Sequence, residues 1–75
     1  MIVYVTSAIP FRGNGEIIAA HSTFDRAIEA AEKYAIDNGF EPIESDEWYW
    51  QTEDIYAAPL SYYGDEIEIK GLDVM

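Results

Sequence analysis

The sequence predicts an α+β fold in which a single antiparallel sheet carries one helix on one face, in the order β-β-α-β-β-β. Three observations lead to this prediction. Segments rich in β-branched and aromatic residues are separated by turn signals, as strands are. One central stretch has the apolar spacing of an amphipathic helix. The chain has 75 residues, enough for one domain, which we place at residues 1–75.

The first two strands are expected over Ile2–Ile9 and Glu16–His21. Residues 10–15, between them, form a turn cluster that contains Gly13 and Gly15, so the two strands should pair as a hairpin. The cluster lacks the glycine spacing and the lysine of a phosphate-binding loop. Because the first segment is apolar on both of its faces, we expect it to lie inside the sheet rather than at an edge.

A helix is expected over residues 23–38, with Ser22 or Thr23 as its N-cap and Gly39 in the left-handed position after its end. Glu29 and Lys33 have the spacing of an ion pair on its outer side. The apolar residues fall on one stripe, which should pack on the sheet: Phe24, Ala27, Ile28, Ala31, Tyr34 and Ala35.

The chain after the helix predicts a loop at 41–47 and a strand at 48–52, with both indoles on one face of that strand. A turn follows at Glu53 and Asp54, and residues 55–59 fit no single element.

The last predicted feature is a hairpin of strands 60–63 and 66–69 around the two-residue turn Gly64-Asp65. Its register pairs Tyr62 with Ile67 and Leu60 with Ile69. The alternation then places Glu66 and Glu68 together on the opposite face, next to an exposed Tyr63.

Negative charge is concentrated in the second half of the chain. The net charge is −11. Residues 1–36 hold four acids against three bases, a net charge of −1, whereas residues 37–75 hold eleven acids against Lys70 alone, a net charge of −10. Nucleic acids and anionic membranes attract basic surfaces, so direct binding to either is not expected. The favoured partner is a basic surface of a nucleic-acid-binding protein or complex.

The sequence offers little catalytic or metal-binding equipment, and we predict a non-enzymatic protein with no cofactor. It has no cysteine, which excludes disulfides and thiolate metal sites, and only one histidine. That histidine, His21, is adjacent to Ser22, and neighbours on a strand point to opposite faces, so they form no catalytic pair. The acidic segments 44–47 and 64–66 lack the alternating ligand pattern of an EF-hand, so only adventitious calcium binding is expected there.

The aromatic residues of the second half have two interpretations. Rings that stack on bases in single-strand binders are surrounded by basic residues, whereas these are surrounded by acids. Tyr49 and Tyr63 are the expected outward-facing rings, and they serve either the core or a protein interface.

The predicted partner-binding surface combines the acidic residues of segment 41–54 and of the last hairpin with these two tyrosines. Glu66 and Glu68, two residues apart on one strand, are spaced by roughly 6.8 Å, a regular repeat of charge like that of a nucleic-acid backbone. The alternative interpretation is a solvated surface that only confers solubility. The candidate residues are Glu44, Asp46, Glu47, Tyr49, Glu53, Asp54, Tyr63, Asp65, Glu66 and Glu68.

In size, acidity, absence of cysteine and strand-helix-sheet layout (1–9, 16–21, 23–38 and 48–69), the chain resembles small phage-encoded anti-defence proteins. These are the anti-CRISPR and anti-restriction proteins, several of which mimic DNA. The resemblance implies a stoichiometric inhibitor that occupies the nucleic-acid-binding surface of a larger host complex.

Two other function classes remain open. One is a host protein-interaction or antitoxin-like regulatory module that binds through exposed aromatic residues, and the other is a small enzyme that depends on His21. We expect a cytoplasmic protein, because the N-terminal segment lacks a signal peptide pattern and no stretch could span a bilayer. A monomer or weak homodimer is expected, since two acidic faces repel each other.

Overall fold

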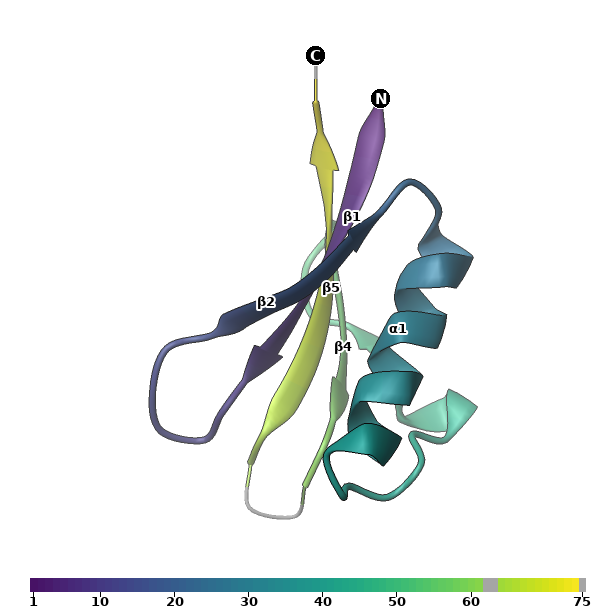
Figure 1. The fold of residues 1–75 in the computed structure, drawn as a ribbon. Helices are drawn as coiled ribbons and strands as arrows, with labels where there is room; N and C mark the ends of the chain where they lie inside the picture. The colour runs from purple at the N-terminus through teal and green to yellow at the C-terminus, as the bar shows by residue number, and fades with distance from the viewer. Residues whose placement is uncertain (62–63, 75) are drawn as a thin grey trace.

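The computed structural model describes residues 1–61 and 64–74, and it confirms the predicted fold class. Five antiparallel strands form one sheet in the order β2-β1-β5-β4-β3, and helix α1 lies along one face of it (Figure 1). The two chain ends lie together at one end of the sheet, where Ile2 pairs with Asp73. The β1–β2 connection lies at the opposite end, as do the C-terminal end of β4 and the N-terminal end of β5 (Figure 1).

Strand β1 (Ile2–Ile9) is an interior strand, as its apolar sequence predicts. It pairs on one side with β2 (Glu16–His21), through the predicted hairpin, and on the other side with β5 (Glu66–Asp73) over its full length. The long β1–β5 ladder therefore brings residues 2–9 and 66–73, far apart in the sequence, side by side in the sheet.

Helix α1 (Phe24–Asp37) has the caps that the sequence predicts. The Thr23 hydroxyl accepts a hydrogen bond from the Arg26 backbone N–H at 3.3 Å. At the other end, the Phe40 N–H donates to the Ala35 carbonyl at 2.8 Å, and Gly39 adopts a φ of +80°.

One helix prediction is wrong. The Lys33 ammonium group lies 3.1 Å from Asp37 rather than against Glu29. Both carboxylates are four residues from Lys33, so the sequence spacing favours either pair.

The core forms between the helix and the sheet. The helix face is lined by alanines, and Ala27, Ala31 and Ala35 are completely buried. From β5, Ile67 and Ile69 project into the same layer and are buried to within 1%. Small helix residues let the backbone of α1 approach the sheet closely, and large β5 residues fill the space beneath it.

The prediction for the last hairpin is wrong in register. Strand β4 is Ile55–Pro59, not 60–63, and it pairs Ala58 with Ile67 and Tyr56 with Ile69. The connection is therefore longer than two residues, and the Leu60 N–H bonds to the Asp65 carbonyl at 2.7 Å. Tyr62, which the prediction paired with Ile67, lies outside the described residues.

The physical reason lies in side-chain size and in loop hydrogen bonds. Ala57 and Ala58 are completely buried, at positions where larger side chains would not fit. Leu60 leaves the sheet and joins the core near the helix C-terminus. The Ser61 hydroxyl donates to the Asp65 carboxylate at 2.7 Å, which closes the loop.

The segment between helix and β4 also differs from the prediction. Strand β3 contains only Tyr49–Trp50 rather than 48–52, and it forms one edge of the sheet. The 41–47 segment is not entirely loop, because Ser45–Glu47 form the short 3-10 helix η1.

Candidate partner-binding surface

Most of the predicted acidic residues gather around edge strand β3. Helix η1 ends one residue before β3, and the turn with Glu53 and Asp54 follows it. We call the following seven residues the acidic surface: Glu44, Asp46, Glu47, Glu53, Asp54, Glu66 and Glu68.

Glu66 and Glu68 share one face of β5, as predicted, although the register that predicted it was wrong. Their neighbours in the strand, Ile67 and Ile69, are buried under the helix, so alternation turns both glutamates to the other face. We call this the open face of the sheet. The glutamates are half-buried there, flanked by β1 and β4.

Tyr49 joins β3 to these glutamates. Its hydroxyl donates a hydrogen bond to Glu66 Oε2 at 3.0 Å, and the side chain spans β4 to do so. The hydrogen bond to Glu66, burial and the negative charges of Glu66 and Glu68 raise the pKa of the Tyr49 phenol above its ordinary value. The residue as a whole is 43% exposed, so Tyr49 remains available at the surface.

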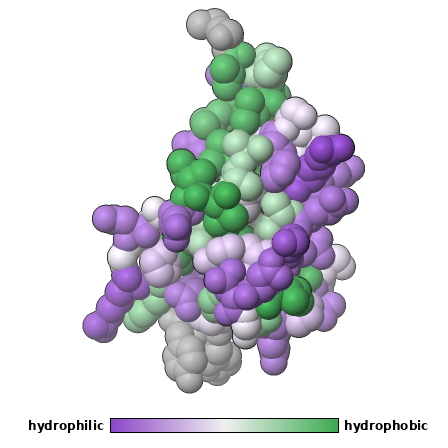
Figure 2. Space-filling view, viewed as in Figure 1, coloured by the Kyte–Doolittle hydropathy of each residue, from purple (hydrophilic) through white to green (hydrophobic). Residues whose placement is uncertain are grey.

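The open face is less uniformly acidic than the sequence predicts. Lys70 follows Glu66 and Glu68 on the same face, because the alternation continues to the end of β5. Its cross-strand neighbours are the apolar residues Val5 and Ile55. Figure 2 shows that hydrophobic residues also form a band from the chain ends down over the strands, with hydrophilic residues on either side.

The second acidic group lies on helix η1. Glu44, Asp46 and Glu47 are all exposed. The Glu47 carboxylate accepts a hydrogen bond from the Glu44 backbone N–H at 3.0 Å, which fixes the turn. The short helix therefore displays its charges from a defined backbone.

The third group, Glu53 and Asp54, lies at the other end of β4. The Asp54 carbonyl accepts a hydrogen bond from the Gly71 N–H at 3.0 Å, which holds the turn against β5. The five residues of β4 separate this turn from the β4–β5 loop, a length of about 14 Å. The acidic surface is therefore spread around β3 and does not form one straight row.

The carboxylate of Asp65 links two loops of the fold through hydrogen bonds. One carboxylate oxygen accepts the Phe11 N–H at 2.9 Å, and the other accepts the Ser61 hydroxyl at 2.7 Å. These two hydrogen bonds lower the pKa of Asp65 below its ordinary value, the bond from Ser61 having the larger effect. Asp65 thus joins the β1–β2 and β4–β5 loops. Tyr63, the other predicted residue of this region, lies outside the described residues.

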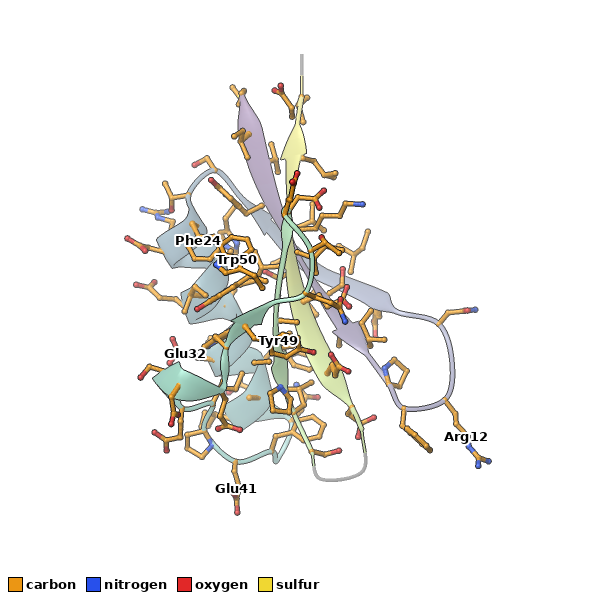
Figure 3. All side chains as sticks on the ribbon, turned by 180° about the vertical axis from the view of Figure 1, so that it is seen from behind. Arg12, Phe24, Glu32, Glu41, Tyr49 and Trp50 are labelled. Atoms are coloured by element: carbon orange, nitrogen blue, oxygen red, sulfur yellow. The ribbon has the colours of Figure 1, made fainter. Side chains whose placement is uncertain are left out.

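Of the four basic residues, Lys70 alone shares a strand with Glu66 and Glu68. Arg12 lies at the tip of the β1–β2 connection, on the other side of the sheet from Glu32 and Glu41 (Figure 3). Arg26 and Lys33 are on the helix, where they line a shallow surface with His21 and Glu29. His21 is half-buried, and its Nδ1 has no hydrogen-bond partner among the described residues.

An aromatic cluster on the helix side of β3 is exposed, which the sequence pattern does not predict. Both indoles share one face, as predicted, and both pack on Tyr56, with ring centroids 5.1 Å away for Trp48 and 4.8 Å for Trp50. Trp50 is nevertheless 60% exposed, because β3 is an edge strand and no further strand of residues 1–61 and 64–74 pairs with it on its outer side. An edge position cannot be read from the local pattern of a two-residue strand.

Among residues 1–61 and 64–74, no helix is long and apolar enough to cross a membrane. In the same part of the chain, no three acidic or histidine side chains are grouped as metal ligands are. Comparisons of the chain with protein-family models, with curated proteins and with solved structures find no match.

Proposed function

We propose that this chain is a non-enzymatic binding protein that blocks the nucleic-acid-binding surface of a larger complex, in the manner of a DNA-mimic inhibitor encoded by a phage or mobile element. The observation that carries the proposal is the charge of −10 on residues 37–75, seven of whose acids surround strand β3. A groove that binds phosphates attracts such a surface by the same electrostatic force that attracts DNA.

The ordered backbone beneath the acids supports a decoy rather than a diffuse coating. Glu66 and Glu68 are held by a strand, Glu47 by a hydrogen-bonded turn and Asp54 by a backbone contact to β5. Charges on an ordered backbone lose little backbone freedom on binding, so more of their attraction contributes to affinity.

The experiment is a capture assay from lysate of the host cells, with the immobilised chain, at about 50 mM and about 500 mM salt. We expect a nucleic-acid-binding protein to be retained at low salt and released at high salt, because screening weakens ionic contacts. Retention that is equal at both salt concentrations contradicts the proposal.

A charge-matched pair of variants separates the acidic surface from net charge. The variant Glu66→Gln/Glu68→Gln removes two charges from the open face, and Glu16→Gln/Glu29→Gln removes two from the β2 side of the molecule. We expect the first to weaken capture about tenfold or more and the second to have little effect. Equal losses indicate an effect of net charge alone.

A second candidate function is supported by the exposed rings of β3. Tyr49 is 43% and Trp50 60% exposed, and such residues are enriched in protein interfaces. A host interaction module or antitoxin-like subunit that uses them would bind almost independently of salt. Alanine substitution of Tyr49 and Trp50 would then weaken capture more than neutralisation of Glu66 and Glu68 does.

A further inference from the structure

A cavity of about 290 Å³ opens between the first turn of α1 and the end of the sheet where the chain termini lie. Its walls include Tyr4, Phe24 and Trp50, the backbone of Gly71 forms part of its lining, and Glu53 and Asp54 lie on its rim. This volume lies at the lower limit for small-molecule sites, so the cavity suits one amino-acid side chain.

The aromatic walls are ordered by their own contacts. Phe24 and Trp50 are stacked with their planes 12° apart and their centroids 6.1 Å apart, and Tyr4 meets Phe24 edge-on at 5.5 Å. Figure 3 shows Phe24 and Trp50 beside each other, on the helix and on β3 respectively. The exposed indole presents a negatively polarised face, which attracts cations.

The three carboxylates around the cavity differ in whether they already have a hydrogen-bond or ion-pair partner. Asp73 also lines the cavity and lies 3.4 Å from the terminal amino group. Asp54 accepts a hydrogen bond from the Thr52 hydroxyl at 2.9 Å. Among the described residues, Glu53 has no hydrogen bond or ion pair, so its carboxylate is free to receive a cation.

We propose that this cavity receives the guanidinium group of an arginine side chain from the basic protein partner. Guanidinium is planar, stacks on aromatic rings and forms two hydrogen bonds to a carboxylate, whereas the ammonium group of lysine is a strongly hydrated point charge. The neighbouring acidic surface indicates that the arginine belongs to a basic protein. The inference rests on the proposed function for its choice of partner, although the cavity itself is tested separately.

Gly71 keeps the cavity open. It follows Ile67 and Ile69 on the helix face of β5. A Cβ at this position would lie 3.6 Å from Tyr4 Cε1 and 3.7 Å from Ile2 Cγ2, both ordinary contact distances. Both neighbours line the cavity, so a side chain at Gly71 would extend into it, and its Cβ would be accommodated at ordinary contact distances.

The test uses the whole chain and the small probe N-acetyl-arginine amide, followed by two-dimensional ¹H–¹⁵N NMR. We expect a saturable shift of the Trp50 indole N–H and of the Gly71 amide signal, with little change at the Trp48 indole. The Trp50→Phe variant assigns the indole signals. The matching citrulline derivative has nearly the same shape without charge, and we expect it to bind about tenfold more weakly or not at all.

Two variants keep the result interpretable. Gly71→Val fills the cavity with a residue that strands favour, and Glu53→Gln removes the free carboxylate; we expect each to weaken arginine binding about tenfold, while the circular dichroism spectrum is unchanged. Equal binding of the citrulline probe, or no saturable shift at Trp50, would overturn the inference. Neither result bears on the salt-sensitive capture by Glu66 and Glu68. The proposed function is therefore tested separately, by the capture assay.

Discussion

At the scale of single residues, Glu66 and Asp65 show how neighbouring carboxylates in an acidic chain take different roles. The Glu66 carboxylate accepts the Tyr49 hydroxyl on the open face, whereas both oxygens of Asp65 accept hydrogen bonds that join two loops. The sequence alone does not separate these two roles, because Asp65 and Glu66 are adjacent and chemically alike.

The Tyr49 contact predicts a change in stability at alkaline pH. The pKa of Tyr49 is raised above its ordinary value of 10.0, first by the bond to Glu66. Its contribution to stability is therefore complete below pH 10 and is lost as pH rises through the folded-state pKa. We expect Tyr49→Phe to reduce the alkaline loss of stability and, at neutral pH, to cost at most about 1 kcal/mol. Urea midpoints measured from about pH 7 to pH 11 check this; parallel pH curves for the two proteins contradict it.

The Asp65 contacts predict a change at the acid end. Its pKa is lowered from the ordinary value of 3.8, so its contribution to stability is present above pH 3.8 and is lost as pH falls through the folded-state pKa. We expect Asp65→Asn to lower the melting temperature at neutral pH and to flatten the acid limb of the stability curve. Asp46→Asn, on the exposed helix η1, is the matched control and should leave the acid limb almost unchanged.

At the scale of elements, the sequence predicts those with a local signal. The helix, its caps and the β1–β2 hairpin each depend on residues close together in the chain, and all three were predicted. The predicted register of the β4–β5 hairpin is wrong because the turn signal at Gly64-Asp65 competes with tertiary packing. Burial of Ala57 and Ala58 and the hydrogen bonds of Asp65 decide that register, and neither can be seen in the local pattern.

The close approach of helix and sheet predicts a strong effect of side-chain size. Ala31 is completely buried, whereas Ala30, its neighbour in the sequence, is only half-buried. We expect Ala31→Leu to destabilise the fold by about 1–3 kcal/mol, because the added atoms would push the helix from the sheet. Ala30→Leu is the control and should change the free energy of unfolding by less than about 0.5 kcal/mol. Equal effects in urea denaturation would mean that the helix packs loosely.

At the scale of the whole molecule, the charge asymmetry could be read from composition, but its arrangement could not. The sequence predicts one continuous group of acids along a loop and a hairpin. The structure instead spreads the acidic surface around β3, with Lys70 at the end of the Glu66–Glu68 row. The cavity beside Trp50 depends on residues from both ends of the chain, which only the β1–β5 pairing brings together.

The net charge of −11 predicts that salt stabilises the isolated chain. Like charges on a small domain repel one another, and screening reduces that repulsion. We expect the melting temperature to rise by several degrees between about 20 mM and about 500 mM sodium chloride. A melting temperature that falls with salt would mean that attractive ion pairs dominate; among the described residues two pairs are formed, both of them exposed.

The most direct test of the decoy function is a competition between the chain and nucleic acid for the captured partner. The partner is loaded with labelled nucleic acid at about 100 mM salt, and the chain is added in increasing amounts. We predict that the label is released stoichiometrically, with one chain replacing the nucleic acid at each site, and that Glu66→Gln/Glu68→Gln requires a much higher concentration. A stable ternary complex of partner, nucleic acid and chain would contradict the account.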